Sequence, residues 1–229
     1  MRDPLDLRSD PLYIKVYDLL KDWILQGRLQ PGTPLKETQL AFELNVSRTP
    51  VRDALRRLEL DRLIVAAQGP TYEVYLPTEK DLHDLYSARA ILEGGAARLA
   101  AERGDQSAFD AMDEILVQMR QAYQGPDPRL IVDLDTRFHE LMLSASGNPV
   151  LVELHSHLST RLRHARSLSG DITGRQTRVL EQHAAIIAAL RSGNGDDAET
   201  ATRTHILSVF QAARDAFRDW HANIHRERK

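Results

Sequence analysis

Four side chains in the second half of the chain have residue types and a spacing that suit a metal ion. Asp135 and His139 stand four residues apart in a segment of helical period, so both project from one face of the predicted helix. His183 and His205 each occupy a position where the apolar stripe of a later segment calls for a hydrophobic residue, and we expect both to point inward. Burying an imidazole is costly unless it is paired or bound to a metal. One carboxylate and three neutral histidines would suit Zn, Ni, Mn or Fe and would leave coordination positions open.

The same four residues allow two other interpretations. The histidines could be separate core residues, each bonded to a neighbouring side chain, because the helices that carry them need not converge. A metal site with open positions could also activate water, which would make the chain a metal-dependent hydrolase with a further domain before its helical half. Against the hydrolase, the sequence has no HExxH pattern and no identifiable paired base beside the cluster.

A second group of residues has the chemistry of nucleic-acid contact. A short helix is predicted over residues 47–58, with Ser47 as its N-cap and Pro50 in its first turn. One face is apolar and carries Val51, Ala54, Leu55 and Leu58. The other side carries Thr49, Arg52 and Arg56, with Arg48 at its edge. Arginine can bond a guanine edge bidentately and a helix N-terminus favours phosphate, so this helix could read a DNA major groove. The alternative is an ordinary surface helix with solvated arginines.

The segments before this helix predict its neighbours. Asp10-Pro11 has the form of an N-cap followed by proline at the first helical position, and it begins a helix that stops near Gly27. One face of that helix is marked by Leu12, Val16, Leu19, Leu20, Trp23 and Ile24. A turn segment over 27–35 and a second helix over 37–44 follow. Because the tight turn Asn45-Val46 then leads into the arginine helix, the two short helices make a helix-turn-helix unit.

After this unit the sequence has the pattern of a β-hairpin. Residues 63–66 form a short apolar run rich in β-formers, and Tyr72, Val74 and Leu76 alternate along a second run. Gln68-Gly69-Pro70 supplies the turn between the two runs. Three helices followed by a hairpin is the winged-helix arrangement. The tip of such a hairpin, near Gly69, can lie along the DNA backbone or in the minor groove.

From residue 78 onward every segment has helical period. Thr78 can cap the first helix, with Asp81 three residues later in a capping-box position. The predicted helices cover 79–103, 106–123, 128–146, 149–167, 173–192 and 197–222. Short connections with glycine, asparagine and aspartate separate them, so we expect a compact six-helix bundle. The fold class is therefore mainly α, with a winged helix-turn-helix domain over 10–77 and an all-helical domain over 78–222.

Composition limits the classes of function. The 229 residues carry a formal net charge of -3, and residues 1–76 hold equal numbers of basic and acidic side chains. Any DNA binding must therefore come from a local patch and not from bulk charge. The absence of cysteine excludes disulfide and thiolate chemistry. The longest apolar run, Ala184 to Leu190, is far too short to cross a bilayer, so we expect a cytoplasmic protein with no membrane partner.

Residues 12–76 resemble the N-terminal domain of GntR-superfamily transcription regulators. The matching motifs are Gly27-x-Leu29-x-Pro31-Gly32-x-x-Leu35 and Leu40-Ala41-x-x-Leu44-x-Val46-Ser47-Arg48-Thr49-Pro50-Val51-Arg52-x-Ala54-Leu55-x-x-Leu58. The resemblance implies that Arg48 and Arg52 contact operator DNA and that the wing-tip Gly69 approaches it. Two features depart from the family. Thr38 stands where many relatives have an arginine, and the wing lacks the basic residues common before that glycine, which suggests fewer backbone contacts or a different base preference.

The second half resembles the all-helical FCD ligand-binding domain of the FadR branch, and its six helices fit the VanR-like subgroup. The matching motifs are Leu85-Tyr86-x-x-Arg89-x-x-Leu92-Glu93, Asp135-x-x-Phe138-His139, Gly147-Asn148-Pro149 and Glu181-x-His183, with His205 beyond. The resemblance implies that Asp135, His139, His183 and His205 bind a divalent metal. The other histidines lack this pattern, and we expect them to be exposed; they are His83, His155, His157, His164, His221 and His225.

The resemblance also implies a small carboxylate effector, held by the metal and a nearby arginine. Arg89 is the first candidate, because a buried guanidinium offers a carboxylate the matching fork. The alternative for Arg89 is an ordinary pair with Glu93, four residues away on the same helix. Arg161 and Arg163 lie on a helix that could also face the pocket.

Together these observations predict a metabolite-responsive transcription regulator, a repressor and not an enzyme. We expect it to bind a pseudo-palindromic operator as a homodimer, because two-fold proteins match two-fold sites. Effector binding would shift the two recognition helices so that their spacing no longer fits the half-sites. A dimeric scaffold whose histidines only pack in the core is a further alternative.

Overall fold

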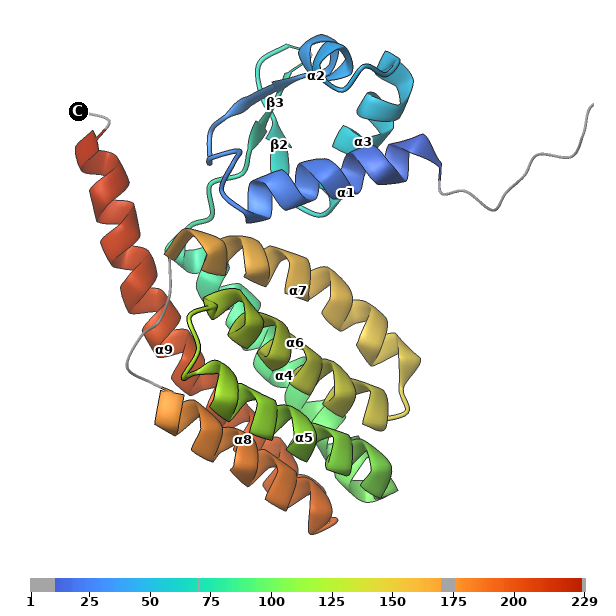
Figure 1. The fold of residues 1–229 in the computed structure, drawn as a ribbon, viewed down its shortest axis with the longest axis vertical. Helices are drawn as coiled ribbons and strands as arrows, with labels where there is room; N and C mark the ends of the chain where they lie inside the picture. The colour runs from blue at the N-terminus through green and yellow to red at the C-terminus, as the bar shows by residue number, and fades with distance from the viewer. Residues whose placement is uncertain (1–10, 70, 170–175, 228–229) are drawn as a thin grey trace, which may run out of the picture. The chain divides into compact units, whose positions relative to one another are not determined.

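The computed structural model describes residues 11–69, 71–169 and 176–227, which are mainly helical (Figure 1). The chain divides into two compact units, Met1–Pro77 with Arg163–Leu168, and Thr78–Leu162 with Ser169–Lys229. The first contains a small sheet and the second is all-helical. The predicted fold class is confirmed.

The first unit is a winged helix. Its helices are α1 (Leu12–Leu25), α2 (Glu37–Glu43) and α3 (Arg48–Leu60). Its strands are β1 (Pro34–Lys36), β2 (Ile64–Ala66) and β3 (Thr71–Val74), antiparallel in the order β1-β3-β2. The hairpin of β2 and β3 follows the predicted segments, with Ile64 opposite Val74. Strand β1 was not predicted, because three residues cannot display alternation. It forms through pairing with β3, where Leu35 stands opposite Tyr72.

The apolar faces of the three helices make the core of this unit. Val51, Ala54, Leu55 and Leu58 of α3 have no exposed surface, as their spacing predicts. In α1 the buried stripe is Val16, Leu20 and Ile24, a strict four-residue repeat. The wider face that the sequence predicts for α1 is wrong at Leu12 and Leu19, which are exposed because they flank this narrow stripe. Asp10, its expected N-cap, lies outside the described residues.

The second unit is a helical bundle. Within its described residues the helices are α4 (Glu79–Arg103), α5 (Gln106–Ala122), α6 (Pro128–Ala145), α7 (Pro149–Ser169), α8 (Gln176–Arg191) and α9 (Gly195–Glu227). Helix α4 packs along α9 and against α6 and α8. The expected first residues of α8, 173–175, lie outside the described residues. Among the helices of the described chain, none combines the length and apolar character needed to cross a bilayer.

Local signals explain both ends of α4, the helix at the centre of the bundle. The Thr78 side chain accepts a hydrogen bond from the Asp81 backbone N–H (3.1 Å), and the Asp81 carboxylate accepts one from the Thr78 N–H (2.8 Å). The predicted capping box is therefore confirmed. At the other end Gly104 adopts a left-handed φ of 69°, a conformation that glycine adopts without strain. These two ends fix the helix that carries Arg89 and Glu93.

Candidate functional site

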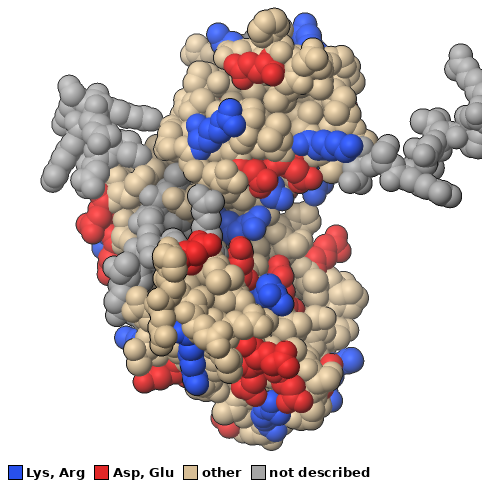
Figure 2. Space-filling model, viewed as in Figure 1, with Lys and Arg blue, Asp and Glu red and all other residues tan. Residues whose placement is uncertain are grey.

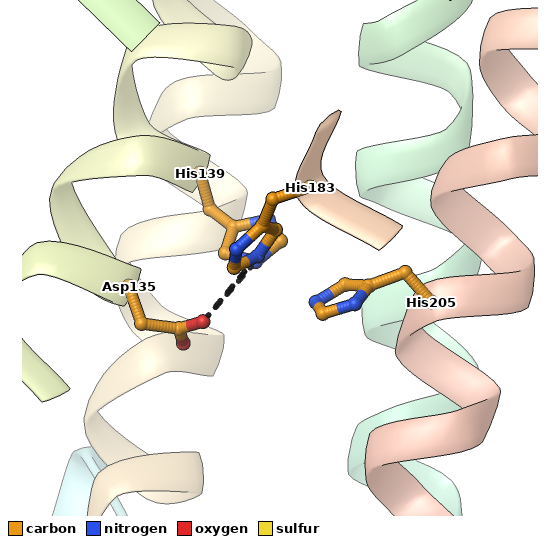
Figure 3. Close-up of side chains that lie close together, drawn as sticks. All are labelled: Asp135, His139, His183 and His205. Atoms are coloured by element: carbon orange, nitrogen blue, oxygen red, sulfur yellow. Dashed lines mark ion pairs between the residues drawn. The ribbon is translucent and has the colours of Figure 1, made fainter. Parts of the chain in front are cut away.

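Three helices of the second unit bring Asp135, His139, His183 and His205 to one place (Figure 3). Helix α6 supplies the aspartate and the first histidine, α8 supplies His183 and α9 supplies His205. One potential ligand atom from each residue lies within 4.8 Å of those of the other three. The four residues that the sequence analysis singled out therefore converge.

The geometry within this cluster centres on the Asp135 carboxylate. Its Oδ1 lies 3.5 Å from Nε2 of His183 and 3.8 Å from Nε2 of His139. The imidazole centroids of His183 and His205 are 4.5 Å apart, and those of His139 and His205 are 5.3 Å apart. Phe138 closes one side, with its ring 4.2 Å from that of His183. The imidazole rings thus lie beside an apolar aromatic side chain.

Burial lowers the pKa of two imidazoles of this cluster. His139, His183 and His205 have at most 1% of their surface exposed. Burial lowers the pKa of His183 to about 3 and holds that of His205 well below its usual value. Neither ring nitrogen of His183 has a hydrogen-bond partner among the described residues, and Nε2 of His205 has none either. The alternative interpretation, in which each histidine is a separate core residue hydrogen-bonded to a neighbour, therefore does not fit His183.

This donor set fits a divalent transition metal. Neutral imidazoles and one carboxylate are the ligands that such ions take from proteins. Ligand atoms of a tetrahedral ion with bonds of about 2.1 Å lie about 3.4 Å apart. Small side-chain rotations would therefore bring the four ligand atoms to the spacing found around a bound ion. The buried nitrogens without partners are the atoms that a metal would satisfy.

Behind the cluster lies Glu93, a fully buried carboxylate whose only predicted contact was with Arg89. Its Oε2 lies 2.7 Å from Nδ1 of His139, and its Oε1 lies 2.8 Å from Nε2 of His155. Burial alone would raise the pKa of Glu93, but the charge of Arg89 and the contacts with His139 and His155 outweigh it and hold that pKa well below its usual value. The carboxylate is therefore charged and positions groups on three helices.

Arg89 forms the pair with Glu93 that was one of its two predicted roles. Its Nε–H donates to Oε1 of Glu93 at 2.6 Å, and the guanidinium is buried. Burial acts to lower the pKa of Arg89, but Glu93 and Asp135 raise it overall, so the side chain is charged. Arg161 is half-buried and Arg163 is exposed on α7, which leaves Arg89 the stronger candidate for a carboxylate.

Three histidines depart from the expectation that the remaining six are exposed: two are buried and one is half-buried. His155 is buried because it faces α4 and pairs with Glu93 there. His164 is also buried, and this burial lowers its pKa. His83 and His157 are exposed as expected. The other two are His221, which is half-buried, and His225, whose side chain lies outside the described residues.

The polar face of α3 is accessible in the first unit. Arg48, Thr49 and Arg56 are exposed, and the Arg52 side chain keeps 42% of its surface exposed. Ser47 occupies the N-cap position as predicted, although its side chain makes no capping bond. Gly69 is exposed at the hairpin tip with a φ of 71°. On the face of the protein that Figure 2 shows, basic and acidic residues are interspersed, in keeping with the net charge of -3.

Both units match known protein families. Residues 12–74 match the model of bacterial regulatory proteins of the gntR family, and residues 84–208 match the FCD domain. The chain is 30% identical over 204 residues to the HTH-type transcriptional regulator YdhC of Bacillus subtilis, covering 89% of each. It is 31% identical over 207 residues to the galactonate operon transcriptional repressor of Escherichia coli, covering 81% of this chain and 89% of that one.

A solved structure agrees with the fold. E. coli McbR/YncC superposes with a TM-score of 0.72 at 23% identity, covering 89% of this chain and 98% of that one. The family and the names of its relatives indicate regulators, so the hydrolase interpretation is not supported. With the winged helix first in the sequence and the FCD bundle second, the chain belongs to the GntR family of bacterial transcription regulators that carry an FCD domain.

Proposed function

We propose that this regulator is a metabolite-responsive repressor whose helical unit binds a divalent transition metal and a small carboxylate. The observation that carries the proposal is the convergence of Asp135, His139, His183 and His205, with neither nitrogen of buried His183 making a hydrogen bond to the described residues. These four residues would hold the metal. When bound, Zn, Ni, Mn or Fe supplies a Lewis-acidic centre that can take a carboxylate oxygen as a further ligand.

Arg89 would hold the other end of the effector carboxylate. Only its Nε–H is used in a hydrogen bond to the described chain, so its two Nη groups remain for a ligand. One helical turn earlier, the hydroxyl of Tyr86 is buried without a partner among the described residues. A hydroxyl or second oxygen of the ligand could satisfy it. These groups favour a small hydroxy acid, and Arg161 is a secondary candidate.

DNA recognition would use α3 and the wing. We assign the contacts to Arg48, Thr49, Arg52, Arg56 and Gly69, which are at least partly exposed on the first unit. A homodimer would place two such helices on a pseudo-palindromic operator. The effector would change their spacing, and a coupling free energy of about 1–3 kcal/mol is enough for such a switch. The six-helix bundle is consistent with membership of the VanR-like subgroup.

Selection of genomic fragments tests this function. Purified protein is mixed with sheared genomic DNA, recovered and sequenced beside the Arg48→Ala/Arg52→Ala double variant. A few sharply enriched sites that the variant fails to recover would support a specific regulator. Diffuse recovery that vanishes with added salt would mean only phosphate binding and would contradict the proposal. The genes beside the enriched sites would then indicate which acids to test as effectors.

A further inference from the structure

An acidic residue lies among the arginines of the DNA-reading face. Glu37 is the first residue of α2, and its side chain is only 14% exposed. Oε1 and Oε2 of Glu37 accept from Nε of Arg52 at 3.1 and 3.2 Å, and Oε2 also accepts from its Nη2 at 3.0 Å. Arg48 approaches the same carboxylate, with Nη2 3.4 Å from Oε2. One carboxylate therefore binds both arginines at the start of α3.

A carboxylate in this position needs an explanation. Near a DNA backbone it repels phosphate and so weakens binding to every sequence. As a surface ion pair it contributes little to stability, because both arginines remain substantially exposed. Neither effect accounts for a side chain aimed at the Nε edge of Arg52.

The geometry of the guanidinium explains why the carboxylate of Glu37 lies there. Arginine has five N–H groups in a planar fork. Glu37 occupies the edge of Arg52 that is formed by Nε and Nη2. The two Nη1 hydrogens and the outer Nη2 hydrogen remain, and they form the end of the fork that bonds O6 and N7 of guanine. Because Glu37 already restricts the Arg52 side chain, DNA binding costs less conformational entropy at this residue.

We propose that Glu37 is a positioning residue that sets the base preference of Arg52 by holding the end of its guanidinium toward the groove. The proposal rests on the DNA-reading role assigned to Arg52 under the proposed function. Glu37 touches no base; it acts through the arginine. Its loss therefore has an unusual signature, since removing a negative charge from the interface strengthens non-specific binding while specificity for one base falls.

The experiment is a selection from a random-sequence DNA library with four full-length proteins: wild type, Glu37→Ala, Arg52→Ala and Glu43→Ala. Glu43 is the matched control, because it is an exposed acid on the same helix and bonds Gln39 instead of an arginine. We expect one guanine position that the wild type prefers at least tenfold to fall below threefold in Glu37→Ala. Arg52→Ala loses the preference at the same position, and Glu43→Ala retains it.

Affinity for unrelated duplex DNA and its salt dependence complete the test. Glu37→Ala binds unrelated DNA as well as or better than the wild type, with an unchanged salt slope. If the base preference survives in Glu37→Ala, or falls equally in Glu43→Ala, the positioning role is wrong. If Glu37→Ala does not melt cooperatively, Glu37→Gln carries the same comparison, with a smaller loss because its amide oxygen still accepts. A wild type that selects no sequence would refute the proposed function, and this inference with it.

Discussion

Oε2 of Glu93 lies 2.7 Å from Nδ1 of His139, and both side chains are buried. A charged carboxylate at this distance favours the tautomer with its proton on Nδ1, which leaves the lone pair of Nε2 toward Asp135 and His183. Carboxylates behind metal-binding histidines commonly have this effect. The relationship joins the buried Arg89–Glu93 pair to the candidate metal centre.

Replacing Glu93 therefore weakens metal binding without removing a ligand. We expect Glu93→Gln to lower affinity for Zn²⁺ by about 10–100-fold, measured by competition with a chelator. Because Arg89 would lose its counter-charge, Arg89→Met/Glu93→Gln is the control that restores a neutral interior. The double variant regains thermal stability but not metal affinity. Wild-type affinity in both variants would show that Glu93 has no part in the site.

Removing a proposed ligand should cost both metal and stability. His205→Ala is expected to lose bound metal and to melt at a lower temperature when metal is supplied, since an ion bound only by the folded state stabilises it by mass action. His157→Ala, which changes an exposed histidine of the same unit, should keep both properties. Equal metal content in His205→Ala and the wild type, measured by elemental analysis, would refute the assignment.

Stability of the metal-stripped protein should fall as the solution becomes acidic. The folded-state pKa of His183 is about 3 and its unfolded value is near 6.5, so between these values the unfolded chain binds more protons and unfolding is favoured as pH falls. From pH 7 to pH 5 this one group costs about 2 kcal/mol, because pH 5 still lies above the folded-state pKa.

The His183→Leu variant isolates this contribution. Denaturant unfolding at both pH values, in the presence of a chelator, should show a smaller acid-induced loss in the variant than in the wild type. His205, whose pKa burial also lowers, accounts for part of the remainder. An identical loss in the two proteins would mean that His183 is not held neutral in the folded state.

The turn before α7 predicts a stability effect of a different origin. Gly147 has a φ of 65°, and a Cβ added there would collide with the guanidinium of Arg103. Gly193 has a φ of 73° with open space around it. We expect Gly193→Ala and Gly147→Ala each to cost about 1–2 kcal/mol from left-handed strain, because the exposed Arg103 side chain can move away from the new Cβ.

A double-mutant cycle in denaturant separates strain from collision. In an Arg103→Ala background the cost of Gly147→Ala should stay the same, because the guanidinium already moves aside when Arg103 is present. If the cost of Gly147→Ala falls in the Arg103→Ala background, the guanidinium is held in place and its collision adds to the backbone strain.

Local pattern was enough to predict much of this structure. The stripe of α3 and the capping box at Thr78 depend on residues three or four apart, and both formed as expected. Convergence of the histidines depended on how α6, α8 and α9 pack, so spacing alone left separate core histidines open. Resemblance to a family supplied the missing information.

The features that could not be predicted from the sequence depend on contacts between distant segments. Glu37 meets Arg52 fifteen residues later, and His155 meets Glu93 from sixty-two residues away, so no helical period marks either pair. His155 does share a face with buried Leu162, seven residues on, which could have signalled its burial. Strand β1 exists only because β3 lies beside it.

The most direct test of the account is the affinity of the metal-loaded protein for a recovered operator fragment, measured by fluorescence anisotropy against a panel of small hydroxy acids and dicarboxylates. The panel is applied to the wild type and to His183→Ala. At least one acid should weaken operator binding about fivefold or more in the wild type and have no effect in the variant. If every acid at saturating concentration leaves wild-type affinity unchanged, or changes it equally in His183→Ala, the proposed coupling between the metal centre and the operator is wrong.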